Sequence, residues 1–124
     1  MNPTELVRLA KTAMQRAYVP YSGYKVGAAL LTKGGKVYLG CNIENAAFGP
    51  SNCAERTAFF TAIAAGETEF ESIAVVGGKD GVVTDIFPPC GVCRQVMQEF
   101  CAPDFMIYMG RGDDSYEAVP LEQL

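Results

Sequence analysis

Cys53-Ala54-Glu55-Arg56 opens the stretch that decides the fold, the run CAERTAFFTAIAAG at residues 53–66. This run is strongly helical in character and predicts a helix over residues 53–65, with Gly66 as its C-terminal cap. A second stretch, Pro89-Cys90-Gly91-Val92-Cys93-Arg94, begins another helix that is predicted over residues 91–100. Both stretches therefore place cysteines at the start of a helix.

The segments around these two helices alternate strands with helices. Asn2-Pro3-Thr4-Glu5 predicts a helix start, with Asn2 as the cap and a proline in the first turn, and Pro20 ends that region. A strand hairpin is predicted over residues 26–32 and 37–41, and later strands over 72–76, 105–109 and 116–119. Residues 77–89 hold three glycines and two prolines and predict a loop. A hairpin followed by β/α alternation favours one mixed sheet covered by helices, in a single domain over residues 1–124.

The composition favours a small-molecule substrate. The chain has 124 residues with 49% hydrophobic and 19% charged, which is typical of a folded globular protein. Its net charge is −4 and no block of Lys or Arg runs along it, so it has no electrostatic footprint for nucleic acid. Neither a signal peptide nor an apolar run long enough to cross a membrane is visible, which predicts a cytoplasmic protein.

The chain has five cysteines and no histidine. An odd number argues against a fully paired disulfide framework, and without histidine any zinc ion must be held by thiolates or carboxylates. Thiols at helix N-termini ionise more easily, because the free N–H groups and the helix dipole favour anions there. Bringing the two helix starts together would converge Cys53, Cys90 and Cys93. Three protein ligands leave the fourth position of zinc open for water, as a catalytic site requires.

Glu55 lies two residues after Cys53, where it can point into the same cleft without binding the metal. It would then be placed to move protons between water, substrate and leaving group. Three thiolates with Zn²⁺ carry a formal charge of −1, which raises the pKa of the bound water. Arg56 and Arg94 can offset this charge by hydrogen bonding to the sulfurs.

These motifs resemble the cytidine deaminase family, and the combination of Cys-Ala-Glu with Pro-Cys-x-x-Cys is close to the general signature of zinc deaminases. The likeness extends to the small homotetrameric branch of the family through AYVPYS at 17–22, VGAALL at 26–31, GCNIENA at 40–46 and CAERTA at 53–58. It covers about residues 14–110. The resemblance implies a three-layer α-β-α fold with a mixed five-stranded sheet.

The resemblance also implies the reaction, a hydrolytic deamination of cytidine and deoxycytidine to uridine and deoxyuridine plus ammonia, in pyrimidine salvage. Cys53, Cys90 and Cys93 match the ligands of one zinc ion per subunit. Zinc-bound hydroxide attacks C4 of cytosine, and Glu55 matches the proton shuttle. The implied partners are the nucleoside substrate and further copies of the chain in a homotetramer, with no nucleic acid and no membrane.

The remaining site residues are placed by the same resemblance. Asn42 and Glu44 match residues that hydrogen-bond the ribose. Tyr24 stands where the family has an aromatic residue, usually Phe, that packs on the pyrimidine. Ala54 is expected to offer its backbone N–H to the base carbonyl.

Ala46 and Phe48 match positions that reach the active site of a neighbouring subunit, which places the active sites near subunit interfaces. The family has Tyr more often at the Phe48 position. The chain also departs from the family in a longer and more apolar loop at residues 77–88, and it ends at Leu124 without the family's short C-terminal tail.

Several alternatives stay open at the level of sequence. Cys90-x-x-Cys93 alone is equally typical of a dithiol redox pair. A structural zinc site would need a fourth ligand, for which Cys41 and Cys101 are available, although free cysteines are commonly just small buried residues. A deaminase of a related aminopyrimidine nucleoside and a non-catalytic zinc-stabilised protein are the competing functions. The acidic charge and short loops argue against a polynucleotide substrate.

Overall fold

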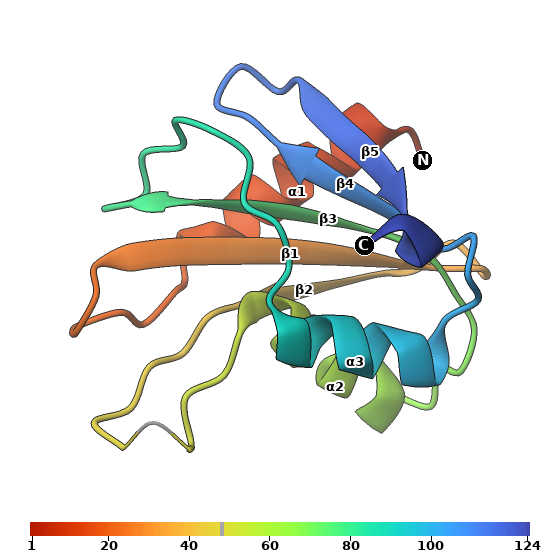
Figure 1. Cartoon of the computed structure of the whole chain (residues 1–124), viewed down its shortest axis with the longest axis horizontal. Coiled ribbons are helices and arrows are strands. Elements are labelled where there is room, and N and C mark those ends of the chain that lie inside the picture. The colour runs from red at the N-terminus through yellow and green to blue at the C-terminus, as the bar shows by residue number, and fades with distance from the viewer. Residues whose placement is uncertain (48) are drawn as a thin grey trace.

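The computed structural model describes residues 1–47 and 49–124, and a five-stranded sheet runs through its centre (Figure 1). In chain order the elements are α1 (Pro3–Met14), β1 (Tyr24–Thr32), β2 (Val37–Cys41), α2 (Ala54–Ala64), β3 (Phe70–Lys79), α3 (Gly91–Phe100), β4 (Met106–Gly110), β5 (Tyr116–Pro120) and the 3₁₀ helix η1 (Leu121–Gln123). The strand order is β2-β1-β3-β4-β5. Only the β3–β4 pair is parallel, so the sheet is mixed.

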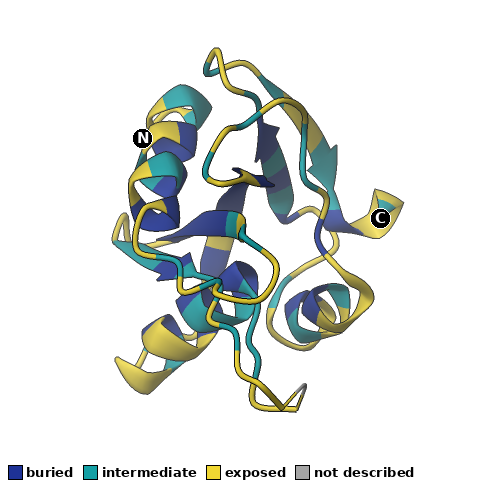
Figure 2. Ribbon diagram, turned by 90° about the vertical axis from the view of Figure 1, so that its left-hand side faces the viewer, coloured by how far each residue is buried: buried dark blue, intermediate teal, exposed yellow. Residues whose placement is uncertain are grey.

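Helix α1 covers one face of the sheet (Figure 2). It begins as predicted, because the Asn2 side chain accepts a hydrogen bond from the Glu5 backbone N–H at 2.8 Å and a proline occupies its first turn. Its apolar side packs on the central strands, where Ala29 and Leu31 of β1 point toward it. None of the helices in the described part of the chain is long and apolar enough to cross a membrane.

Helices α2 and α3 cover the opposite face, and their apolar side chains share one core with Ala28 and Leu30 of β1 (Figure 1). Successive β1 residues therefore serve opposite faces, which is the period of two that a strand imposes. Phe59 of α2 is fully buried. The helices on both faces confirm the predicted three-layer α-β-α arrangement around a mixed five-stranded sheet.

The backbone of α2 lies very close to β2 at its first residue. A Cβ atom on Gly40 would stand 2.4 Å from the carbonyl oxygen of Ala54 and 2.5 Å from the backbone nitrogen of Ala58. Only glycine fits at such a distance. The absence of a side chain at residue 40 thus sets how deeply the start of α2 sits on the sheet.

The loop predicted from residue 77 begins later than expected. Strand β3 continues to Lys79, with Gly77 and Gly78 paired to Val26 and Lys25 of β1. A Cβ atom on Gly78 would lie 2.0 Å from the Val82 carbonyl oxygen, so the following loop folds back directly over the strand. The glycines mark this close approach, and the prediction that they belong to a loop was wrong. The predicted β1 start at residue 26 was likewise two residues late, since the strand starts at Tyr24.

Candidate metal centre and binding cavity

Three cysteines converge where α2 and α3 begin. Cys53 is the N-cap of α2, Cys90 is the N-cap of α3, and Cys93 lies in the first turn of α3. Their Sγ atoms all lie within 4.8 Å of one another, with 3.2 Å between Cys90 and Cys93 and 3.6 Å between Cys53 and Cys90. Within residues 1–47 and 49–124, no fourth cysteine, aspartate or glutamate joins the group, and both Cys41 and Cys101 lie outside it.

This donor set fits a zinc ion. Sulfurs at about 2.3 Å from a common tetrahedral ion stand about 3.8 Å apart, which falls within the spacing of the three thiols. Hydrogen bonds from the Cys93 thiol and from Arg56 lower the pKa of Cys53 to about 5, so one thiolate forms readily at neutral pH. The pKa of Cys93 is raised by its hydrogen bond to Cys53 and by burial. A cation bound among the three sulfurs would lower the pKa of Cys93 and so favour its thiolate form.

The two arginines that follow the cysteines have different contacts. Arg56 Nη2 donates a hydrogen bond to Cys53 Sγ at 3.2 Å, which is the kind of sulfur contact expected from the sequence. Arg94 Nε instead donates to the carbonyl oxygen of Pro89 at 3.2 Å. The expected sulfur contact of Arg94 is therefore replaced by a bond that ties α3 to the residue before Cys90.

Glu55 is a buried carboxyl group beside the cysteines. It is the second residue of α2, its residue surface is 1% exposed, and its Oε1 atom has no hydrogen-bond partner among the described residues. Burial raises the pKa of Glu55 to about 7, with the nearby Cys53 charge acting in the same direction. A carboxyl group with a pKa near neutrality and a free oxygen is suited to accept and return a proton.

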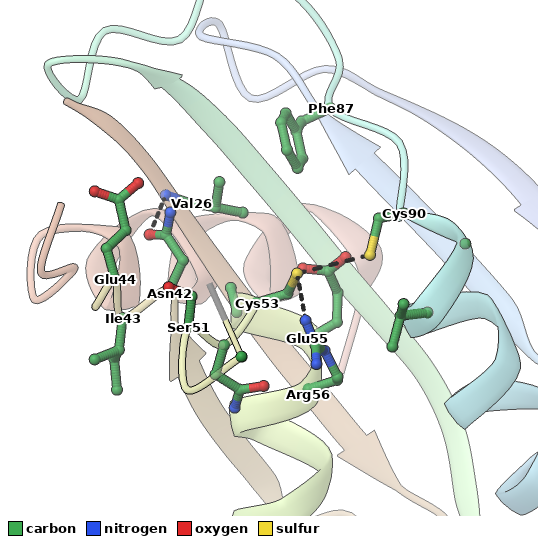
Figure 3. Close-up of a pocket in the computed structure, with 15 residues that line it drawn as sticks. Val26, Asn42, Ile43, Glu44, Ser51, Cys53, Glu55, Arg56, Phe87 and Cys90 are labelled. Carbon is green, nitrogen blue, oxygen red and sulfur yellow. Dashed lines mark hydrogen bonds between the residues drawn. The ribbon is translucent and has the colours of Figure 1, made fainter. Parts of the chain in front are cut away.

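Glu55, Cys53 and Cys90 line one side of a cavity of about 530 Å³ (Figure 3). Such a volume is typical of small-ligand sites. The remaining walls come from the loop after β2 and from apolar side chains around the opening: Val26, Asn42, Ile43, Glu44, Gly49, Ser51, Asn52, Ala54, Arg56, Phe87, Gly91 and Val92. The cysteines and Glu55 thus line the same cavity as the polar side chains of the loop after β2 and the apolar side chains Val26 and Phe87.

Asn42 and Glu44 form the polar wall, and the neighbouring backbone fixes both side chains. Asn42 Oδ1 accepts from the Val26 N–H at 2.9 Å, and its Nδ2 donates to the Tyr24 carbonyl oxygen at 2.8 Å. Glu44 Oε1 accepts from the backbone N–H groups of Tyr21 and Ser22, each at 3.1 Å, and Oε2 accepts from the Ser22 hydroxyl. These Ser22 bonds keep the pKa of Glu44 below its usual range. Both side chains retain unused hydrogen-bonding capacity toward the cavity.

Two other predicted site residues, Tyr24 and Ala46, do not line this cavity. Tyr24 is 37% exposed, and its ring centroid lies 5.5 Å from that of Phe87, which does line it. Ala46 is exposed in the loop after β2, and Phe48 lies outside the described residues. Phe87 was not among the predicted site residues, and the apolar character noted for the loop at residues 77–88 was the available signal.

The whole chain is similar in sequence and fold to proteins of known activity. The family described as "Cytidine and deoxycytidylate deaminase zinc-binding region" matches residues 1–109. A cytidine deaminase of Sporosarcina psychrophila is 49% identical over 109 residues, which cover 88% of this chain and 77% of that protein. One from Halalkalibacterium halodurans is 45% identical over 124 residues, covering 100% and 91%. The 1.6 Å crystal structure of the Burkholderia pseudomallei cytidine deaminase matches with a TM-score of 0.90 and 45% identity, covering 99% of this chain and 95% of that one.

Proposed function

The chain belongs to the cytidine and deoxycytidylate deaminase family, and from this membership we propose how its own residues carry out the reaction. The protein is a cytidine deaminase, a zinc hydrolase of pyrimidine salvage. Water replaces the C4 amino group of cytidine or deoxycytidine, which yields the uracil nucleoside and ammonia. The observation that carries the assignment of roles is the meeting of three thiols and the buried Glu55 at one cavity.

Cys53, Cys90 and Cys93 would hold one zinc ion per chain, and three protein ligands leave one coordination position for water. Bound zinc supplies a Lewis acid that makes water a usable nucleophile near neutral pH. Arg56 stabilises the thiolate of Cys53 through its hydrogen bond to the sulfur. The protein's contribution at this point is to keep three anionic ligands together at two helix N-termini.

Glu55 acts as the proton carrier. Its unpartnered Oε1 atom accepts a proton from the attacking water, and the protonated carboxyl then delivers that proton to N3 of the pyrimidine. A second proton from the same water reaches the departing amine through Glu55, so ammonia leaves and the C4 carbonyl forms. The raised pKa supports both directions of transfer, because the charged and neutral forms of Glu55 are close in free energy near neutral pH.

Asn42 and Glu44 bind the ribose hydroxyls, and Ala54 offers its backbone N–H to the base carbonyl. Two facts support these roles. All three residues line the cavity that holds Glu55 and Cys53. Ala54 is the first residue of α2, where backbone N–H groups have no partner within the helix. The base and the sugar are thereby directed to opposite ends of the cavity.

The chain self-associates as a homotetramer in this proposal, with Ala46 and Phe48 reaching a neighbouring active site. Support comes from the family resemblance and from Ile43 and Val92, apolar side chains that are 45% and 56% exposed at the cavity. Sedimentation velocity measures the mass directly. A species that stays monomeric at the concentrations of the activity assay would contradict this part of the proposal.

The reaction is tested by following the ultraviolet absorbance of cytidine and deoxycytidine with purified protein, with free cytosine as the matched control that lacks a sugar. Glu55→Gln keeps the shape of the side chain and removes its proton-transfer capacity. We expect turnover of both nucleosides, little turnover of cytosine, and a loss of about 10²–10⁴-fold in kcat for Glu55→Gln with zinc content unchanged. A Glu55→Gln variant as active as wild type would remove Glu55 from the mechanism, and bound zinc without turnover would favour a non-catalytic zinc protein.

A further inference from the structure

Lys79 is a cation at the end of β3 that has no role in the function described so far. It is the last residue of that strand and is paired in register with Tyr24, the first residue of β1. We propose that Lys79 is a positioning residue for substrate binding, which acts through Ser22 to hold the carboxylate of Glu44 ready for the sugar. This inference rests on the proposed function, because it deepens the ribose-binding role assigned there to Glu44.

The turn before β1 is the element on which the Glu44 side chain depends. All the hydrogen bonds that its carboxylate accepts from the described residues come from this turn, namely from the backbone N–H groups of Tyr21 and Ser22 and from the Ser22 hydroxyl. The Ser22 hydroxyl oxygen also accepts from the backbone N–H of Tyr24 at 3.0 Å. A displacement of this turn would therefore break these contacts or move the carboxylate with it.

Lys79 and the residue after it tie this turn to the end of β3. The Lys79 ammonium group donates a hydrogen bond to the Ser22 carbonyl oxygen, and the backbone N–H of Asp80 donates to the carbonyl oxygen of Gly23 at 2.7 Å. The start of β1 and the end of β3 lie side by side at one edge of the molecule (Figure 1). Ser22 thus receives Lys79 on its carbonyl oxygen and contacts Glu44 through its N–H and its hydroxyl.

Gly23 makes room for the ammonium group. Its backbone has a φ of 70°, in the left-handed region that glycine favours. A Cβ atom at this residue would lie 2.8 Å from Lys79 Nζ and 3.2 Å from Asp80 Oδ1. A side chain at residue 23 would displace the lysine head group, so the absence of one lets the end of β3 close on the turn.

The charge of Lys79 has a second effect on the same carboxylate. No ion pair joins Lys79 directly to Glu44 in the described part of the chain. The pKa of Glu44 is held below its usual range chiefly by the hydrogen bonds from Ser22, and the positive charge of Lys79 acts in the same direction. An ionised carboxylate is a stronger acceptor for a sugar hydroxyl than a neutral carboxyl group. Lys79 therefore favours both the position and the charged state in which Glu44 accepts a sugar hydroxyl.

A role through Glu44 predicts an effect that depends on the sugar hydroxyls. A nucleoside without those hydroxyls gives Glu44 no donor to accept from, so loss of Lys79 should leave its binding unchanged. Cys53, Cys90 and Glu55 come from the starts of α2 and α3 rather than from this turn, so the chemical step should keep its rate. Lys79 should thus act on KM rather than on kcat.

Four variants test the inference: Lys79→Met, Lys79→Arg, Glu44→Ala and the double variant of Lys79→Met with Glu44→Ala. The readouts are kcat and KM for cytidine and, independently of turnover, the inhibition constants of uridine and of 2′,3′-dideoxyuridine, which lacks the hydroxyls on C2′ and C3′. We expect Lys79→Met to raise the KM for cytidine and the inhibition constant of uridine about two- to fivefold, the scale of one contact between exposed groups, with kcat unchanged. Affinity for 2′,3′-dideoxyuridine should equal that of wild type. Lys79→Arg, which keeps the cation and its donors, should restore most of the uridine affinity.

The double variant separates action through Glu44 from a general effect on the fold. In the Glu44→Ala background, Lys79→Met should cause no further loss of uridine affinity, because residues that act through one another are not additive. Lys36→Met is the matched control and should match wild type, since Lys36 is an exposed lysine in the turn between β1 and β2. Zinc content and far-ultraviolet circular dichroism show whether each variant is folded.

Three results would overturn the inference while leaving the deaminase assignment intact. They are wild-type uridine affinity in Lys79→Met, an equal loss for uridine and 2′,3′-dideoxyuridine, and additive losses in the double variant. Wild-type uridine affinity in Glu44→Ala would overturn the ribose-binding role of Glu44 and the inference with it. A wild-type protein that neither converts cytidine nor binds uridine would overturn the proposed function as a whole.

Discussion

Arg56 Nη2 lies 3.2 Å from the sulfur of Cys53, which precedes Arg56 by three residues at the start of α2. The N-terminal end of this helix therefore supplies both a metal ligand and the cation that stabilises its thiolate. The arrangement is local in sequence, and it needs no other element to form. It also explains the direction of the Arg56 pKa, which is raised by the hydrogen bond to Cys53.

Removing this cation should weaken zinc binding. We expect Arg56→Gln to bind zinc about 10–100-fold more weakly than wild type, as is usual when a group hydrogen-bonded to a metal ligand is lost. Competition with a chromogenic chelator measures the affinity. Arg8→Gln is the control, since Arg8 is exposed and pairs with Asp114 far from the cysteines. Equal zinc affinity in wild type and Arg56→Gln would mean that the sulfur contact is incidental.

Zinc stoichiometry should divide the five cysteines into two groups. Serine in place of Cys53, Cys90 or Cys93 should lower both the zinc content and the midpoint of thermal unfolding, because metal bound only to the folded state stabilises it. Cys41→Ser and Cys101→Ser should keep about one zinc ion per chain. Atomic absorption on the purified variants decides the matter. Loss of zinc in Cys41→Ser or Cys101→Ser would indicate a fourth thiolate ligand and a structural site.

Enlarging residue 40 should damage both stability and activity. Gly40→Ala places a methyl group against the backbone of α2 at residues 54 and 58, and overpacking of this kind costs about 1–3 kcal/mol in the free energy of unfolding. The displaced helix start carries Cys53 and Glu55, so kcat should fall as well. Urea denaturation and cytidine turnover give the two readouts. The control is Gly34→Ala, where the nearest atom to the new methyl is Thr32 Oγ1 at 3.8 Å.

The ion pairs of Asp114 should make part of the stability dependent on pH. Lys11 and Arg8 hold the pKa of Asp114 below its usual range. Since the folded pKa is lowered, the contribution is fully present above the ordinary aspartate pKa of about 3.9 and is lost as the pH falls through the lower folded value. Asp114→Asn is the suitable variant, because Asn tolerates the positive φ of 69° at this residue.

We expect Asp114→Asn to be less stable than wild type at about pH 7, with the difference shrinking in strong acid and at high salt. Urea denaturation of both proteins across pH measures this difference directly. A gap that stays unchanged as the pH falls from about 7 to far below the ordinary aspartate pKa of about 3.9 would point to packing rather than charge as its origin.

Local patterns were sufficient to predict much of the fold and the metal centre. The cap at Asn2, the strand hairpin over residues 26–41 and the helix start at Cys53 each depend on neighbouring residues, and the structure contains all of them. Glu55 and Cys53 are two residues apart, so their placement near each other followed from helix geometry. The joining of Cys53 to Cys90 needed the tertiary fold, and its prediction rested on the family resemblance, since two helix starts need not meet.

The apolar side of the cavity, formed by Val26 and Phe87, could not be predicted from local sequence patterns. Gly77 and Gly78 carry the ordinary signal of a loop, but here they let a loop and an aromatic ring approach a strand. The position of Phe87 depends on that approach and on Tyr24, which comes from the other end of the chain. The hydrogen bond from Arg94 to the Pro89 carbonyl oxygen was equally inaccessible from the sequence, because it depends on the path of the loop.

The location of the cysteines also determines when during folding the chain can first capture its metal. Cys53 follows β2 and Cys90 follows β3, and these strands flank β1 in the sheet. Before β1 has paired with both, a nascent chain offers only the dithiol Cys90-x-x-Cys93, which has one ligand too few. Tight zinc uptake is therefore a late event that depends on long-range strand pairing. Metal capture during refolding would therefore report completion of the central sheet.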